Sequence, residues 1–131
     1  MNEQRAIQFL NDVRKPLLAL HKAILDHERA AYEREFGAVT PAAFLQVLIN
    51  GAGYRWIAPL SSIITNIDEA LDAKDATEAD RIAAAQSVGA LFSGEESAPF
   101  FERYQALLQS SPDVLQRHGQ VAPLLSRLQD A

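Results

Sequence analysis

The sequence predicts an all-α protein, a single-domain bundle of five to six helices around a long N-terminal helix. Hydrophobic residues recur at helical spacing through most of the 131 residues, and no stretch shows the alternation typical of a strand. Proline and glycine interrupt this pattern at points that leave only short connections between helices. A chain of this length can bury one core, so residues 1–131 are expected to form a single helical domain.

The long N-terminal helix is predicted from residues 16–36, the longest amphipathic stretch in the chain. Successive helical residues lie about 100° apart around the axis, so positions three, four and seven apart share a face. On this count one face is mostly apolar and the opposite face is charged. The apolar face carries Leu17, Leu20, Ile24, Leu25, Ala31 and Tyr32.

Pro16 separates this stretch from residues 2–15, whose apolar residues follow in the same phase. The two segments can therefore form one helix. A proline inside a helix removes one backbone hydrogen bond and crowds the preceding turn, so we expect a kink or a short break at Pro16. Gly37 is expected to end the helix in a left-handed conformation.

A second helix is predicted at residues 41–50, because Thr40 followed by Pro41 is typical of a helix start. This segment is apolar around most of its circumference, so we expect it to be short and well covered by the rest of the protein. Gly51 and Gly53 are expected to form a turn between helices. A phosphate-binding loop would need a preceding strand and a longer glycine motif.

A third helix is predicted to begin near Trp56, because Pro59 is tolerated only in the first turn of a helix. Tyr54 and Arg55 are then expected at a junction. Residues 68–81 contain six carboxylates against two basic residues, which indicates a local acidic patch. A calcium loop is not expected there, because the segment lacks the central glycine.

Four further start and stop signals complete the helix assignment. Thr77 with Asp80 resembles a capping box for a fourth helix, which Gly94 is expected to end. Proline after serine marks the start of a fifth helix near residue 98 and of a last segment near residue 112. Because Gly119 and Pro123 interrupt that last segment, we expect it to form two short pieces.

The composition excludes several classes of function. The chain has no cysteine, so disulfides, thiolate zinc ligation and thiol catalysis are impossible. Seventeen acidic residues against twelve basic ones give a net charge of −5, so neither nucleic acid nor an anionic membrane is expected as a partner. No apolar run is long enough to span a membrane and the N-terminal residues do not resemble a leader. We therefore expect a cytoplasmic location.

Two segments, LHKAILDHERAAYEREFG at residues 20–37 and WIAPLSSIITNIDEALD at residues 56–72, resemble a small family of uncharacterised, all-helical bacterial cytoplasmic proteins. The resemblance covers roughly the first 72 residues. It implies a bacterial, cytoplasmic, all-helical protein. No activity is established for that family, so the resemblance implies no substrate, cofactor or functional residue.

His21 and Glu28 are the candidate functional residues, because both fall on the apolar face of the long helix. They are seven residues apart, or about 10.5 Å along the axis, so each needs its own partner. A buried carboxylate needs a basic group or a hydroxyl, and we expect one from another helix. Candidate partners for Glu28 are Arg55, Arg103 and Tyr104.

Two interpretations of these residues remain open. They can form a polar network that specifies how the helices pack. Alternatively they line a pocket between helices, where bundles usually bind ligands. The candidate ligand-binding residues are His21, Glu28, Tyr32, Trp56 and Arg55.

The sequence contains no pattern typical of an enzyme. No glutamate is followed three residues later by histidine, which excludes the usual di-iron motif. His21 and His27 lie about 120° apart around the helix, too far to share a metal. No serine lies in a nucleophile elbow, so we predict no catalytic residue, metal site or cofactor. The leading hypothesis is a non-enzymatic protein-interaction module, including self-association, and the alternative is a small-ligand-binding bundle.

Overall fold

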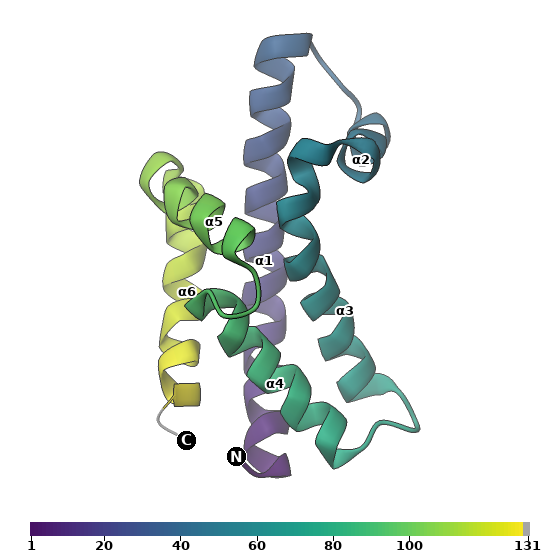
Figure 1. The fold of residues 1–131 in the computed structure, drawn as a ribbon, viewed down its shortest axis with the longest axis vertical. Helices are drawn as coiled ribbons and strands as arrows, with labels where there is room; N and C mark the ends of the chain where they lie inside the picture. Colours follow the sequence, from purple (N-terminus) through teal and green to yellow (C-terminus); the bar gives the residue numbers. More distant parts are fainter. Residues whose placement is uncertain (130–131) are drawn as a thin grey trace.

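The computed structural model describes residues 1–129 and confirms the all-α bundle around a long N-terminal helix. α1 runs through the middle of the molecule, and the start of α1 and the end of α6 lie at the same end of it (Figure 1). Over residues 1–129 there is no strand. The elements are α1 (Glu3–Phe36), α2 (Pro41–Asn50), the 3-10 helix η1 (Ala52–Ile57), α3 (Ala58–Asp72), α4 (Glu78–Ser93), α5 (Ala98–Ser110) and α6 (Pro112–Gln129).

α1 is continuous through Pro16, so the expected break is absent. Val13 and Leu17, on either side of the proline, are both fully buried and hold the two segments in one helix. The Asn2 side chain accepts a hydrogen bond from the Arg5 backbone N–H at 2.9 Å and caps the start. Gly37 ends the helix at φ 92° and ψ 174°, so its φ is positive, as expected, but its conformation is not left-handed helical.

The other start signals are confirmed. Thr40 accepts a hydrogen bond from Ala43 N–H at 3.1 Å, and Thr77 forms a complete capping box with Asp80. The hydrogen bonds from the Thr77 backbone and side chain lower the pKa of Asp80. Gly94 ends α4 in the left-handed conformation.

α6 is one helix of 18 residues, so the prediction of two short pieces was wrong. Val114 and Val121 are fully buried, and Leu124, Leu125 and Leu128 beyond them are partly buried against the core. Gly119 and Pro123 are both exposed. The packing of the buried face therefore outweighs the local cost of these two residues.

The core lies where α1 packs against α3, α4 and α6. Two arginines on the rim of this core add ion pairs. Arg14 of α1 contacts Asp68 and Asp72 of α3 at 2.8 and 2.6 Å, and Arg81 of α4 contacts Glu3 at 3.0 Å. The hydrogen bond that Arg14 donates to Asp72 and the charges of both aspartates raise the pKa of Arg14. The fully buried large residues include Leu10, Val13, Leu17, Leu20, Ile24, Leu60, Ile67, Val88, Leu91, Phe100, Tyr104 and Val114.

Two general features bear on function. In the described part of the chain, no helix combines the length and the apolar character that crossing a membrane requires. Over residues 1–129, histidines and carboxylates nowhere gather in a group of three or more that could hold a metal ion.

Candidate functional site

The C-terminal end of α1 extends beyond the rest of the bundle. The last buried residue of α1 is Glu28, and every residue from 29 to 36 is exposed or intermediate. This end stands above the other helices, and the chain returns from it through α2 (Figure 1). We call residues 29–50, the end of α1 together with α2, the arm.

Short-range contacts hold the arm together. Arg29 donates a hydrogen bond to the Val39 carbonyl at 2.8 Å, and Glu33 accepts one from the Val39 N–H at 3.0 Å. Phe44 of α2 is 4% exposed, and its ring lies 5.7 Å from that of Tyr32 and 5.9 Å from that of Tyr54. The arm is thus attached to α1 and η1 by a small aromatic cluster and by backbone contacts of its loop.

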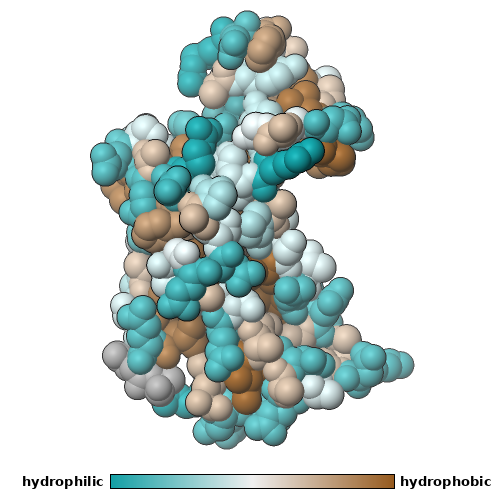
Figure 2. Space-filling view, viewed as in Figure 1, coloured by the Kyte–Doolittle hydropathy of each residue, from teal (hydrophilic) through white to brown (hydrophobic). Residues whose placement is uncertain are grey.

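The arm exposes three large apolar side chains. Phe36 is 65% exposed, Leu45 53% and Ile49 65%. We call these three residues the α2 patch. Figure 2 shows the arm overhanging a concave side of the molecule, with hydrophobic residues on the overhang. The prediction that residues 41–50 are well covered was therefore wrong, because α2 packs on η1 and only Phe44 is buried.

His21 has the partner from another helix that its position predicts. Its Nε2 lies 2.9 Å from Ser61 Oγ, which joins α1 to α3. Burial lowers the pKa of His21, because the charged imidazolium is disfavoured where water is excluded. This hydrogen bond links α1 to α3 at the edge of the core.

Glu28 is 8% exposed, but its expected partner from another helix is absent among residues 1–129. The nearest basic group is on its own helix, with His27 Nδ1 3.9 Å from Glu28 Oε1. Burial and then the charge of Glu28 raise the pKa of Tyr54 in η1. The other candidate partners make different contacts: Arg103 lies over the Trp56 ring and Tyr104 bonds to His118.

Trp56 lies in a second aromatic cluster, apart from the contacts of Tyr32. Its ring centroid is 6.2 Å from that of Phe100 and 5.4 Å from the Arg103 guanidinium carbon. Arg55, beside it in η1, is exposed. None of the three cavities described for residues 1–129 is lined by His21, Glu28, Tyr32 or Trp56. The structure thus places these four residues in separate polar and aromatic contacts.

One polar pair was missed from the sequence. The Tyr104 hydroxyl lies 2.7 Å from His118 Nδ1, and Tyr104 is 1% exposed. Burial raises the pKa of Tyr104 and lowers the pKa of His118, so this hydrogen bond joins a neutral tyrosine and a neutral histidine. The signal was available: the two residues lie on consecutive helices joined at Ser111, so an antiparallel pairing brings them together.

Two hydroxyl–imidazole pairs are present, His21 with Ser61 and Tyr104 with His118, and in the described part of the chain neither histidine also contacts a carboxylate. The buried Tyr104–His118 pair and the His21–Ser61 pair each satisfy their own groups, and they lie on different helix pairs. The large apolar side chains of the α2 patch are exposed and lie outside the core. The chain matches no protein-family model, no curated protein and no solved structure.

Proposed function

We propose that the protein is a non-enzymatic helical module that acts through protein contacts, including contact with a second copy of itself, and that the α2 patch is the contact surface. The observation that carries the proposal is the exposure of three large apolar side chains on one projecting arm. A monomeric soluble protein scatters single apolar residues over its surface, whereas apolar residues gathered at a projecting site are typical of an interaction site.

The charge distribution supports a second copy as the partner. The ten residues of α2 include no charged side chain, although the chain as a whole carries a net charge of −5. In a two-fold dimer the same patch meets itself, so charges on it would face like charges. A neutral helix is free of that repulsion, and depletion of charge is typical of the centre of an interface.

The size of the patch indicates weak association. Burying one large apolar side chain completely contributes about 1.5–3 kcal/mol, and these three are each about half exposed before contact. Both copies together therefore gain about 5–10 kcal/mol. Association costs about 4–15 kcal/mol. Only the surplus of gain over cost contributes to affinity, and the ranges allow a surplus of at most about 6 kcal/mol. The dissociation constant should therefore lie between about 40 µM and the millimolar range.

Light scattering over a range of protein concentration tests the proposal. The mean mass should be close to 14.4 kDa at low concentration and should rise toward twice that value between about 10 µM and about 1 mM. The double variant Leu45→Glu/Ile49→Glu should stay at the mass of one chain, because it places four carboxylates in a two-fold contact.

The matched control is Leu18→Glu/Leu115→Glu. Those leucines are 45% and 51% exposed and lie outside the arm, on α1 and α6. This variant should associate like the parent, and circular dichroism establishes that both variants are folded. A parent protein of single-chain mass at about 1 mM, or equal loss of association in both double variants, would contradict the proposal.

A further inference from the structure

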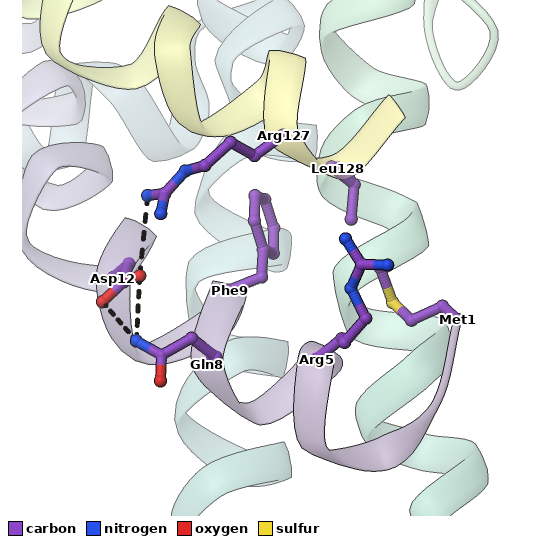
Figure 3. A pocket seen from close by; sticks show the side chains of 7 residues that line it. All are labelled: Met1, Arg5, Gln8, Phe9, Asp12, Arg127 and Leu128. Carbon is purple, nitrogen blue, oxygen red and sulfur yellow. Dashed lines mark hydrogen bonds and ion pairs between the residues drawn. The ribbon is translucent and has the colours of Figure 1, made fainter. Parts of the chain in front are cut away.

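A cavity of about 140 Å³ lies between the first turns of α1 and the last turn of α6, remote from the arm. Its apolar lining comes from Met1, Phe9 and Leu128. Figure 3 shows the Phe9 ring in the centre of the group, with polar side chains on both sides. Phe9 is 7% exposed, so it forms a nearly buried wall that a ligand would reach at its edge.

The polar lining carries an excess of positive charge. Gln8 Nε2 donates to both carboxylate oxygens of Asp12 at 3.0 Å, and Arg127 Nη2 lies 3.6 Å from Asp12 Oδ2. In the described part of the chain, the Arg5 guanidinium makes neither a hydrogen bond nor an ion pair. Two guanidinium groups and one carboxylate therefore line this cavity, on a chain whose net charge is −5.

We propose that this cavity binds a short-chain aliphatic carboxylate. The carboxylate pairs with Arg5 on one side of the Phe9 ring, and the positive charge of Arg127 on the other side adds to the attraction (Figure 3). The alkyl chain lies against Phe9 and Leu128. The planar guanidinium presents parallel N–H donors that match a carboxylate, and such charged hydrogen bonds are the strong ones. The apolar wall adds affinity only for an anion with a hydrocarbon part.

The volume limits the ligand to a small molecule. A water molecule takes about 30 Å³ in the liquid, so 140 Å³ corresponds to about five waters. Pockets for drug-sized ligands are usually about 300–1,000 Å³, so longer fatty acids and nucleotides exceed this space. Butyrate suits both the volume and the polarity of the lining.

Titration of the ¹⁵N-labelled protein with butyrate, followed by amide chemical shifts, tests the assignment. Saturable shifts are expected at Gln8 and Phe9 in α1 and at Leu128 in α6. The neutral isostere butyramide should bind at least about tenfold more weakly, since it cannot form the charged hydrogen bonds. Inorganic phosphate should also bind more weakly than butyrate, because it makes no use of the apolar wall.

Variants of exposed residues separate the site from a general charge effect. Arg5→Gln should weaken butyrate binding by about tenfold, whereas Arg34→Gln, near the opposite end of the same helix, should leave it unchanged. Asp12→Asn should strengthen binding several-fold, because it releases Arg127 from its ion pair. Circular dichroism confirms that each variant is folded.

Any of the following results would overturn the proposal. The first is equal binding of butyrate and butyramide, which would show that charge plays no part. The second is tighter binding of phosphate than of butyrate, which would indicate a site for inorganic anions. The third is the same loss for Arg5→Gln and Arg34→Gln, or no saturable shift at Gln8 and Phe9, which would show that the cavity is not a ligand site.

Discussion

Glu28 divides α1 into a long part, residues 3–28, and a short part, residues 29–36, which differ in how other elements cover them. We call these parts the core half and the outer half. From Ala6 to Ile24 the inner face of α1 is almost completely buried by α3, α4 and α6, and ion pairs of Arg14 and Arg81 lie around it. After Glu28 the same helix contacts Val39 through Arg29 and Glu33, and Tyr32 packs against Phe44 of α2. One half of the helix therefore builds the core, and the other carries an exposed apolar surface away from it.

The two parts should therefore differ in role: one stabilises the fold, and the other contacts a second copy of the protein. The side chains of the covered half contribute most of the burial that holds the fold together. The α2 patch contributes little to that core, so its apolar residues are not explained by folding alone. If the comparison is correct, substitutions in the two halves will change different measurable properties.

The largest expected effect comes from a matched pair of leucine truncations. Leu20 is fully buried in the core half, whereas Leu45 is 53% exposed in the arm. Leu20→Ala should lower the free energy of unfolding by about 2–5 kcal/mol, because it removes buried methyl groups and leaves a cavity. Leu45→Ala should change it by no more than about 0.5 kcal/mol. Urea denaturation measures both, and similar losses would break the comparison.

Glu28 marks the boundary between the halves. It is 8% exposed, and among residues 1–129 it has only the distant contact with His27. Because a desolvated carboxylate without good hydrogen bonds is costly, Glu28→Leu should stabilise the fold by about 1 kcal/mol. Glu35→Leu, at an exposed position in the arm, should have an effect within about 0.5 kcal/mol. A clear loss of stability in Glu28→Leu would show that the carboxylate has a structural partner.

The pH dependence of stability should come from the two paired histidines. Burial lowers the pKa of His21 and of His118 below the unfolded value of about 6.5. A folded state that binds fewer protons than the unfolded state loses stability as the pH falls. The free energy of unfolding should therefore fall from pH 7 to pH 5, by about 1.4 kcal/mol for each unit of pKa lowering.

Glutamine variants assign this effect. His118→Gln keeps an acceptor for the Tyr104 hydroxyl but does not titrate, so the fall in stability should be smaller than in the parent. His21→Gln should reduce it in the same way beside Ser61. An unchanged pH profile in both variants would exclude the histidines as its source.

The smallest effect is expected at the rim of the core. Arg81 contacts Glu3 at 3.0 Å and donates to the Ala70 carbonyl at 3.1 Å, with its side chain 22% exposed. Arg81→Gln should cost about 0.5 kcal/mol, as is usual for surface ion pairs. The loss should shrink in about 1 M salt, where charges are screened within about 3 Å. A loss that is independent of salt would assign it to the carbonyl contact.

The sequence predicted the helices well because caps are local. Thr40 and Thr77 satisfy backbone groups within three residues, so their roles follow from neighbouring residues alone. The unbroken helices through Pro16 and Pro123 could not be predicted, because contacts with other helices keep them continuous. Buried residues flank Pro16, whereas Val121 before Pro123 is buried and Leu124, Leu125 and Leu128 after it are partly buried against the core. The candidate site was harder to predict. Periodicity correctly placed Glu28 on the buried face, but it could not show what lies opposite.

Periodicity also could not distinguish a covered apolar helix from an exposed one. Leu45 and Ile49 look like core residues in the sequence of α2, and only the tertiary arrangement leaves them uncovered. The short connection at Ser111 indicates an antiparallel α5 and α6, but the contact between Tyr104 and His118 also depends on the angle and register of these two helices. These features arise from how helices meet, which spacing along one helix does not determine.

Amide hydrogen exchange at two protein concentrations tests the central claim most directly, because it reads both halves of α1 and the arm in one experiment. At about 10 µM the amides of α2 should exchange much faster than those of residues 13–24, and at about 1 mM α2 should become several-fold slower while residues 13–24 are unchanged. Exchange in α2 that is independent of concentration, or that is as slow as in the core half at low concentration, would contradict the account.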